Sequence, residues 1–491
     1  MIERLRPRDR AFLDAESPTV PRHNATVEVF DADGTGFDYD RFVTLILDRI
    51  SFVPRYRQRV QWVPGQLAQP VWVDDDLFDI GYHVRRSALP RPGSTEQLRE
   101  LVARIVSRPL DRQRPLWEIY FVEGLADGRV ALLYKTHQAL VDGVETVDLG
   151  QVLLDTDPEV RVLGGDEWRP RRRPSPTALV AGALRDNLTD PVSALGAVRH
   201  AGGAVLRTAD HAASGVATVL SGLAGRRPAR GTALSGELSQ QRRVVGVETT
   251  LADHRTVRDA HGGTVNDVVL ATLAGGLRAW LMTRSSSMGG LRQVQALVPV
   301  SVIDRELEAT SLGSQIAPHH VTLPIAEPSP VVRLHQVSYS FQAHKETGRA
   351  VAANRLAGIA GFAPTTFHAI GSRVAATESR DFQLSITNVP GPQSPLYAAG
   401  ARMVSTYPVP PLLPGHALSM GVTSYDGKVF YGITADRDLV PDVDVLAQCV
   451  SDALAELVDT ATGARPAARR GRRRKASSQK PAPAPTPGPK G

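Results

Sequence analysis

Residues 134–143 read YKTHQALVDG and place a histidine, a glutamine, an aspartate and a glycine within seven positions. They follow Val130–Tyr134, and both this run and Leu116–Phe121 are rich in β-branched and aromatic residues. The turn-prone segment Ala126-Asp127-Gly128 separates the two runs, so the pattern predicts a strand pair that delivers His137 just past a strand end. A histidine and an aspartate at such a place are typical of an acid–base site.

A helix is predicted immediately before this strand pair. Residues 95–106 read TEQLRELVARIV and put Leu98, Leu101, Val102 and Ile105 on one face. Ser94 and Gln97 have the spacing of a capping box, in which each side chain bonds the backbone of the other. We expect the helix to end before Pro109.

A chain of 491 residues, 42% of them apolar, is longer than one hydrophobic core needs, so we expect two domains with appendages. The single cysteine, Cys449, excludes an internal disulfide and a multi-cysteine metal site and suits a reducing compartment. No run approaches eighteen uninterrupted apolar residues, and the N-terminus leads into no apolar signal region. We therefore expect a cytoplasmic protein that neither carries a standard secretion signal nor spans a membrane.

The formal net charge of +6 belongs to the end of the chain. Residues 464–491 carry nine basic side chains and no acidic one, which leaves minus three for the rest. This tail ends in the proline-rich PAPAPTPGP, so we expect it to be disordered. Its arginine block could bind anionic lipid headgroups or nucleic-acid phosphates, or only solvate the chain. The lack of interleaved aromatic side chains argues against nucleic acid.

Between residues 158 and 239 the composition shifts to arginine, proline, alanine and glycine. Ser175-Pro176 and Asp190-Pro191 are each typical of a helix N-cap followed by proline. Apolar residues after them recur at helical spacing, which predicts amphipathic helices that either lie on a lipid surface or pack on the body. The apolar face is thin and rich in Ala and Gly, which favours a packed connector.

A second domain is predicted from about Gln241 onward. Thr264 is placed to cap an amphipathic helix, and strand patterns follow at residues 294–300, 321–324 and 382–386. Residues 418–433 alternate apolar side chains about Asp426-Gly427, a turn pair typical of hairpins. Strands and helices are mixed without a regular β-α-β order, which predicts an α+β fold.

Several of these motifs resemble known acyltransferase sequences. Residues 137–143 are similar to the HHxxxDG signature of acyl-CoA-dependent acyltransferases, a superfamily that includes chloramphenicol acetyltransferase. More specifically, five further segments resemble, in the same order and over nearly the whole chain, those of the bacterial wax ester synthase/diacylglycerol acyltransferase family. They are FLDAESPT (12–19), PLDRQRPLWE (109–118), TVNDVVLA (264–271), VPVS (298–301) and NVPGP (388–392).

The resemblance implies an organisation and an activity. It implies two chloramphenicol acetyltransferase-like α+β halves, residues 1–156 and 241–463, with a tunnel between them, a helical connector at 157–240 and the tail at 464–491. The implied reaction moves a fatty acyl group from acyl-CoA directly to diacylglycerol or a long-chain alcohol. It needs no metal and no cofactor besides acyl-CoA as co-substrate. The enzyme would work at a membrane or lipid-droplet surface, reached through the connector and the basic tail.

The family motif places four catalytic-site residues. His137 matches the first histidine, Asp142 the aspartate that holds the loop, and Gly143 the glycine that leaves room beside the reacting atoms. Gln138 stands where the family has its general base. A carboxamide can orient a hydroxyl but cannot hold a proton near neutral pH, and loss of a general base typically costs about 10²- to 10⁴-fold in rate.

Two alternatives follow for His137. If the strand continues, side chains 137 and 138 face opposite sides, so His137 is either a buried structural residue or a substitute base reached by a twist of the loop. The chain is accordingly either an acyltransferase or a lipid- or acyl-CoA-binding relative of slow turnover. A third reading, an amide-forming condensation enzyme, disagrees with the five family segments.

The remaining site residues come from the resemblance alone. It implies that they line the tunnel near the acyl chain or CoA, although the segment at 388–392 also has the composition of a rigid turn. They are Pro115, Leu116, Trp117, Asn266, Asp267, Asn388, Pro390 and Gly391.

Overall fold

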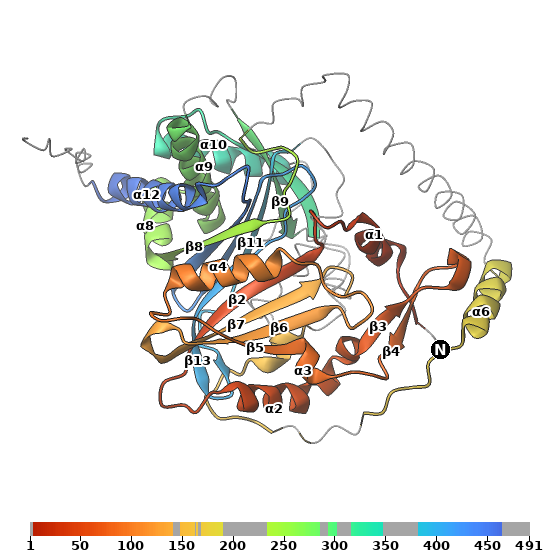
Figure 1. Cartoon of the computed structure of the whole chain (residues 1–491). Coiled ribbons are helices and arrows are strands. Elements are labelled where there is room, and N and C mark those ends of the chain that lie inside the picture. The colour runs from red at the N-terminus through yellow and green to blue at the C-terminus, as the bar shows by residue number, and fades with distance from the viewer. Residues whose placement is uncertain are drawn as a thin grey trace, which may run out of the picture.

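The computed structural model describes residues 3–463 apart from 141–147, 163, 165–167, 190–232, 285–292, 302–315 and 347–381. Within these residues the chain forms two halves, each built on a six-stranded mixed sheet, and a small third sheet beside the first half (Figure 1). The predicted α+β class with two sheet-rich halves is therefore confirmed.

The sheet of the N-terminal half carries the strand pair predicted from the sequence. The sheet has the order β12 (Tyr397–Ala398), β13 (Ala401–Val409), β2 (His23–Asp31), β7 (Arg129–His137), β6 (Trp117–Glu123) and β5 (Val84–Ala88). The predicted pair is β6 and β7, which are neighbours in the sheet and run antiparallel on either side of the predicted turn.

Each face of this sheet is covered by helices because both faces are apolar. On one face lies α4 (Thr95–Val106), which has the predicted bounds and the predicted capping box, and its Leu98 and Val102 pack on Val27 and Leu133. The other face packs on α2 (Tyr39–Arg49) and α5 (Leu149–Leu153). The small sheet has the order β1 (Glu3–Arg4), β4 (Val71–Asp74) and β3 (Gln58–Gln61), with α1 (Pro7–Ala15) and α3 (Ile80–His83) in the same half.

The C-terminal half repeats this design with its own core. Its sheet has the order β10 (Ile316–Leu323), β9 (Val294–Ser301), β11 (Leu384–Pro390), β14 (Leu418–Tyr425), β15 (Lys428–Asp436) and β8 (Arg242–Thr250). The hairpin predicted about Asp426-Gly427 is confirmed as β14–β15. The helices are α8 (Leu251–His261), α9 (Val265–Thr283), capped by Thr264 as predicted, α10 (Pro330–Glu346) and α12 (Val443–Thr462).

One segment does not follow the predicted division at residue 241. Strands β12 and β13 belong by sequence to the C-terminal part, yet β13 pairs antiparallel with β2 and so completes the N-terminal sheet. The boundary in the sequence is thus not a boundary in space. A strand pattern identifies a strand but not its partner, which is why the sequence did not reveal this exchange.

A row of glycines lets β13 cross the C-terminal sheet. Gly421, Gly432 and Gly246 are register partners on β14, β15 and β8. A Cβ atom on Gly432 would lie 1.7 Å from the carbonyl oxygen of Pro408, and one on Gly246 would lie 2.6 Å from the ring of Tyr407. The side-chain-free row therefore forms one of the contacts that join the two halves.

Gly432→Ala should lower the free energy of unfolding by about 2–3 kcal/mol, because the added methyl group must displace backbone. Urea unfolding measures this. Gly182→Ala is the matched control: it lies in α6 (Pro176–Thr189) with its nearest neighbour 3.9 Å from the added carbon, so it should be neutral or slightly stabilising. Equal midpoints for wild type and Gly432→Ala would mean that β13 does not cross so closely.

The connector is described only in part. Helix α6 begins at the predicted Pro176, and the hydroxyl of Ser175 accepts a hydrogen bond from the N–H of Ala178 at 3.1 Å. The second predicted connector helix and the tail lie outside the described residues. Among the helices that are described, none is both long enough and apolar enough to cross a membrane.

Candidate active site

The end of strand β7 presents two neighbouring side chains to opposite faces of the sheet. His137 is the last residue of β7, and its Cα pairs with that of His23 on β2, whose ring nitrogen Nε2 lies 3.0 Å from the Val106 carbonyl oxygen at the end of α4. The backbone N–H of Gln138 continues the ladder by donating to the carbonyl of Arg22 at 2.9 Å. His137 therefore faces the α4 side and Gln138 the opposite side, as the alternation of side chains predicts.

Both ring nitrogens of His137 face fixed groups. The ring is fully buried, and its Nδ1 accepts a hydrogen bond from the N–H of Ala139 at 3.0 Å. The proton of the neutral ring therefore sits on Nε2, which lies 3.7 Å from Oε1 of Glu16. Burial lowers the pKa of His137 in spite of this carboxylate, so the ring is neutral at pH 7. Its one lone pair is already used, and it can accept a proton only by giving up the bond to Ala139.

Glu16 holds the partners of His137 together. Its carboxylate accepts two hydrogen bonds from the guanidinium of Arg112, at 2.8 and 2.6 Å, and one from the N–H of Arg22 at 3.1 Å. Burial alone would raise the pKa of Glu16. The opposing contributions of His137, the Arg22 N–H and Arg112 outweigh burial and lower that pKa to about 2. Glu16 is thus a carboxylate at neutral pH, and both bonds from Arg112 reach the same oxygen, Oε2, while Oε1 accepts from the Arg22 N–H.

Three of the motif segments therefore meet at one place. Glu16 comes from the segment at 12–19, Arg112 from the segment at 109–118, and His137 from the segment at 134–143. Glu16 and Arg112 are not among the site residues predicted from the sequence. Their signal was present, since each is a charged residue inside a short family segment, but nothing in the sequence paired residues 96 positions apart.

Gln138 has a buried side chain with a free acceptor. Its Nε2 donates weakly to Oδ1 of Asn24, at 3.5 Å. Its Oε1 has no hydrogen-bond partner among the described residues. A buried amide oxygen without a hydrogen-bond partner is uncommon. Such an oxygen can accept a hydrogen bond from the hydroxyl group of a substrate.

The predicted residues Pro115, Leu116 and Trp117 are all buried and support the strand end. The Leu116 carbonyl accepts the N–H of His137 at 2.9 Å. The indole N–H of Trp117 donates to the Tyr56 carbonyl at 2.7 Å, and the ring of Trp117 stacks on the ring of His83. Contact of these residues with substrate stays a prediction.

The predicted residues of the second half form a separate hydrogen-bonded group. The side chain of Asn388 donates to Oδ1 of Asn266 at 2.8 Å, which joins β11 to the start of α9. Asp267 completes the capping box of α9 by accepting from the N–H of Thr264 at 2.9 Å, and it also accepts from the Ser338 hydroxyl at 2.7 Å, so its carboxylate has structural partners. Their role in substrate binding is untested by these contacts, none of which joins them to His137 or Gln138.

The end of β11 is closely packed against β14. Pro390 is the last residue of β11, and the N–H of Gly391 donates to Oγ of Ser424 at 3.2 Å. A Cβ atom on Gly391 would lie 2.2 Å from the Ser424 carbonyl oxygen, so glycine is required there. Asp142 and Gly143, predicted for the catalytic loop, lie outside the described residues.

Stability should fall as the pH is lowered from about 7.5 to about 5.5. Burial lowers the pKa of His23, His83 (to about 4), His137 and His254, whereas the unfolded chain takes up these protons near pH 6.5. The unfolded state then binds more protons than the folded state. Each of these histidines therefore lowers the free energy of unfolding by up to about 1.4 kcal/mol per pH unit. Glu16 adds to the loss only below its ordinary pKa of 4.5. Urea unfolding at the two pH values measures the slope.

His254→Gln provides the control for this slope. His254 bonds the Thr250 carbonyl at 2.8 Å and the Tyr431 hydroxyl at 2.6 Å, far from the strand end of β7 in the sequence. Removing its ring should flatten the pH dependence by up to about 1.4 kcal/mol per pH unit. A stability that does not change between the two pH values would contradict the buried, neutral state of these rings.

The chain is similar to known proteins over most of its length. The model of the wax ester synthase/diacylglycerol acyltransferase catalytic domain matches residues 5–269, and that of the family's C-terminal domain matches residues 312–458. A probable diacylglycerol O-acyltransferase of Mycobacterium tuberculosis, tgs1, is 33% identical over 468 residues, which cover 94% of this chain and 97% of that protein. Another from the same species, tgs3, is 41% identical over 262 residues, covering 52% of this chain and 96% of that protein.

Solved structures agree with these sequence matches. The wax ester synthase/diacylglycerol acyltransferase from Marinobacter aquaeolei VT8 aligns with a TM-score of 0.64 at 27% identity, covering 94% of this chain and all of that chain. The first condensation domain of the calcium-dependent antibiotic synthetase aligns at 0.53 with 13% identity, over 95% of this chain and 97% of that one, which shows a shared fold alone. The chain belongs to the wax ester synthase/diacylglycerol acyltransferase family and is an acyltransferase.

Proposed function

We propose that this acyltransferase takes its acyl group from a fatty acyl-CoA and transfers it to diacylglycerol, making triacylglycerol. The names of the two mycobacterial relatives favour diacylglycerol as acceptor. The name of the Marinobacter structure keeps a long-chain alcohol, and hence a wax ester, as the alternative acceptor.

The proposed chemistry is a direct transfer. The acceptor hydroxyl attacks the thioester carbonyl, its proton leaves, a tetrahedral intermediate forms, and the thiolate of CoA departs as the ester is completed. Gln138 occupies the position of the base, and its partner-free Oε1 can accept the hydrogen bond of the hydroxyl and orient it. Since an amide cannot hold the proton, the proton must reach water or the departing thiolate by another route. We therefore assign slow turnover to the wild-type enzyme.

The geometry of His137 carries this assignment. A substitute base needs a free lone pair directed at the acceptor, but Nδ1 of His137 accepts from Ala139, and the protonated Nε2 lies 3.7 Å from the Glu16 carboxylate. His137 also faces the side of the sheet opposite to Gln138. The second candidate function, a protein that binds acyl-CoA or neutral lipid with negligible turnover, is favoured by the same observation.

Thiol release from palmitoyl-CoA separates the two candidates. Purified protein is assayed with and without dioleoylglycerol or hexadecanol, and the ester product is identified by chromatography. Release that depends on dioleoylglycerol, at a slow rate, supports the enzyme. If palmitoyl-CoA binds but no thiol is released with either acceptor, the lipid-binding function is supported instead. If thiol release depends on hexadecanol and not on dioleoylglycerol, the acceptor is a long-chain alcohol.

We also propose that the enzyme works in the cytoplasm at a membrane or lipid-droplet surface. The acceptor diacylglycerol is water-insoluble, the tail has nine basic residues, and α6 exposes Leu184. Flotation with vesicles that contain phosphatidylglycerol tests this. A chain lacking residues 464–491 should float less, and equal flotation would remove the tail from the proposal.

A further inference from the structure

Glu28 is an acidic side chain in the interior of the N-terminal half. It lies on β2, where its Cα pairs with that of Leu132 on β7 and with that of Thr406 on β13. Its side chain is 0% exposed, and neither carboxyl oxygen has a hydrogen-bond partner among the described residues. The Thr406 hydroxyl beside it is in the same position. A glutamate buried without a partner is rare and needs a physical explanation.

Glu28 is directed at the face of the sheet that carries α5. Its sequence neighbours Val27 and Val29 belong to the apolar cluster under α4, so the alternation of side chains places Glu28 on the other face. Leu149 and Leu153 of α5 pack in the apolar cluster of that face. Gln138 lies on the same face, opposite to α4.

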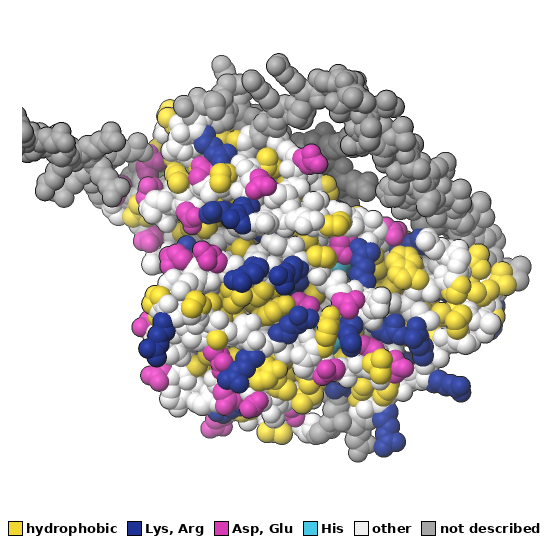
Figure 2. Space-filling view, in the orientation of Figure 1, with side chains coloured by type: hydrophobic (Ala, Val, Ile, Leu, Met, Phe, Trp, Pro, Cys, Tyr) yellow, Lys and Arg dark blue, Asp and Glu magenta, His cyan; other side chains and the backbone are white. Residues whose placement is uncertain are grey.

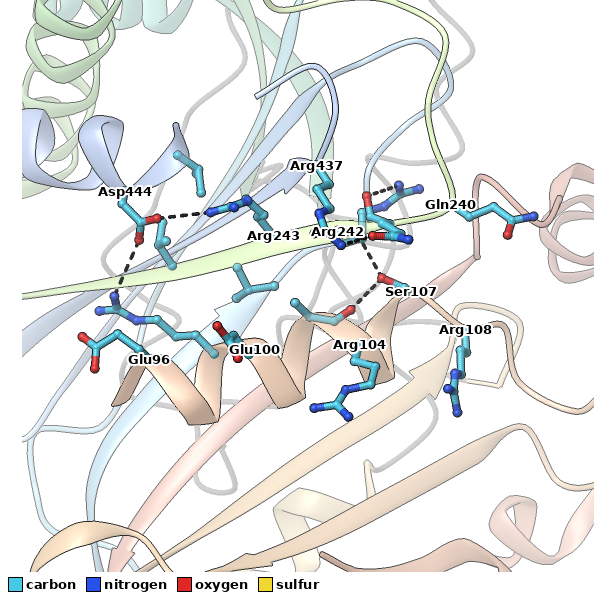
Figure 3. A pocket seen from close by; sticks show the side chains of 16 residues that line it. Glu96, Glu100, Arg104, Ser107, Arg108, Gln240, Arg242, Arg243, Arg437 and Asp444 are labelled. Atoms are coloured by element: carbon cyan, nitrogen blue, oxygen red, sulfur yellow. Dashed lines mark hydrogen bonds and ion pairs between the residues drawn. The ribbon is translucent and has the colours of Figure 1, made fainter. Parts of the chain in front are cut away.

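The acidic side chains of α4 are in a different environment. Glu96 and Glu100 are exposed and line a groove of about 730 Å³ between α4 and β8, on the side of the sheet opposite to Glu28 (Figure 3). Figure 2 shows acidic and basic side chains interspersed over the surface in view, where water and neighbouring charges stabilise them. The buried Glu28 lacks this stabilisation, so burial disfavours its charged form.

A second carboxyl group, that of Asp148, lies at the start of α5. It accepts hydrogen bonds from the N–H of Gly150 at 3.2 Å and from the hydroxyl of Tyr56 at 2.8 Å. It thereby caps α5, and these bonds favour its ionised form. Asp148 comes five positions after Gly143 of the catalytic motif, so α5 is the first described element that follows the motif.

The groups around Glu28 keep it protonated. Burial, and after it the negative charge of Asp148, raise the pKa of Glu28 to about 8, although the nearby Tyr134 hydroxyl lowers it. Tyr134 and Tyr425 also lie within electrostatic reach of Glu28, and burial raises the pKa of both hydroxyls, so both are uncharged. Glu28 is therefore a neutral carboxyl group at pH 7 that faces a carboxylate.

We propose that Glu28 and Asp148 hold a single proton between them and that this proton positions α5 behind the catalytic motif. With the proton in place, Glu28 is an uncharged group beneath the helix, and Asp148 can cap α5. When the proton leaves, two carboxylates repel each other in the core, and movement of α5 away from the sheet relieves the repulsion. Glu28 is thus a positioning residue whose state depends on pH. This role is independent of the acyl donor and acceptor that the enzyme uses.

Hydrogen exchange of residues 149–153 tests the positioning. In wild type, the protection of these amides, corrected for intrinsic exchange, should fall about ten-fold between pH 7 and pH 9, because opening lets Glu28 ionise at its ordinary pKa. Glu28→Gln has the shape of the protonated side chain and should keep its protection. Glu100→Gln, on the exposed side of α4, should behave as wild type does. Equal protection at both pH values in wild type, or an equal fall in Glu28→Gln, overturns the proposal.

The free energy of unfolding gives a second readout with a definite sign. The pKa of Glu28 lies above its ordinary value of 4.5, so its contribution to stability is complete below pH 4.5 and is lost as the pH rises to about 8. Between pH 5.5 and pH 7.5, the unfolding equilibrium constant of wild type should therefore rise by up to about one hundred-fold relative to that of Glu28→Gln. This sign is opposite to that of each buried histidine, so Glu28→Gln should lose stability more steeply on acidification. Parallel profiles overturn the proposal.

Two further measurements separate the pair from burial alone. Asp148→Asn removes the neighbouring charge and keeps a capping side chain, so in this background the ratio for Glu28→Gln should be smaller. An undiminished ratio would remove Asp148 from the pair and overturn the proposal. Infrared spectra of wild type in heavy water should show the stretch of a protonated carboxyl group at neutral pH that disappears by about one pH unit above 8. The lack of this band would overturn the proposal without any variant.

Discussion

Gln138→His should raise the rate of acyl transfer by about 10²- to 10⁴-fold, the usual contribution of a general base. The substituted ring would occupy the position that Gln138 now fills on the face of the sheet opposite to His137. Because Nε2 of Gln138 already donates to Oδ1 of Asn24, an acceptor is in place to hold one ring N–H. The other ring nitrogen then keeps its lone pair for the proton of the acceptor hydroxyl.

The measurement is acceptor-dependent thiol release from palmitoyl-CoA, compared as kcat and as kcat/KM. The increase should appear in kcat, since proton transfer acts in the transition state. Gln138→Asn is the matched control, because it keeps an amide and should give no increase. Gln138→Leu should lie below wild type, since it also removes the group that orients the hydroxyl.

If Gln138→His does not raise the rate of acyl transfer, the variant His137→Ala shows why. If wild type and Gln138→His turn over equally and His137→Ala loses all transfer while remaining folded, then His137 is the base and its ring must leave Ala139 during catalysis. If His137→Ala instead lowers stability and leaves the slow transfer in place, the ring is a structural element. We expect the second result from the two fixed nitrogens.

Local features of the fold could be predicted from the sequence. The helix at 95–106 begins and ends where its apolar spacing and its capping box placed it, because both signals depend on residues within a few positions. The β14–β15 hairpin was predicted by the same kind of local chemistry at Asp426-Gly427. The opposite orientation of residues 137 and 138 follows from strand alternation alone.

Features that depend on distant residues could not be predicted in this way. The exchange of β13 into the N-terminal sheet depends on a glycine row whose members, Gly246, Gly421 and Gly432, align only once three strands have paired. The ion pair of Glu16 with Arg112 joins residues 96 positions apart. Neither has a periodic pattern, so a single sequence contains no signal for the pairing itself.

Replacing Arg112 with leucine should lower the free energy of unfolding by about 3 kcal/mol, at the low end for breaking a buried ion pair. Glu16 is 3% exposed, and its carboxylate would lose the guanidinium bonds at 2.8 and 2.6 Å while remaining out of water. Among the described residues, His137 at 3.7 Å and the N–H of Arg22 would remain beside it, and Lys135 is near enough to interact with it electrostatically. Urea unfolding near neutral pH measures the loss.

A double-mutant cycle shows whether the loss belongs to the pair. Arg112 is 39% exposed, so Glu16→Leu leaves a guanidinium that water can solvate and should cost less than Arg112→Leu. The double variant Glu16→Leu/Arg112→Leu should be more stable than Arg112→Leu alone, because no charge is then buried without a partner. If the two single losses simply add, Glu16 and Arg112 are not coupled. His137 would then owe its position to packing and to Ala139 rather than to the ion pair beside it.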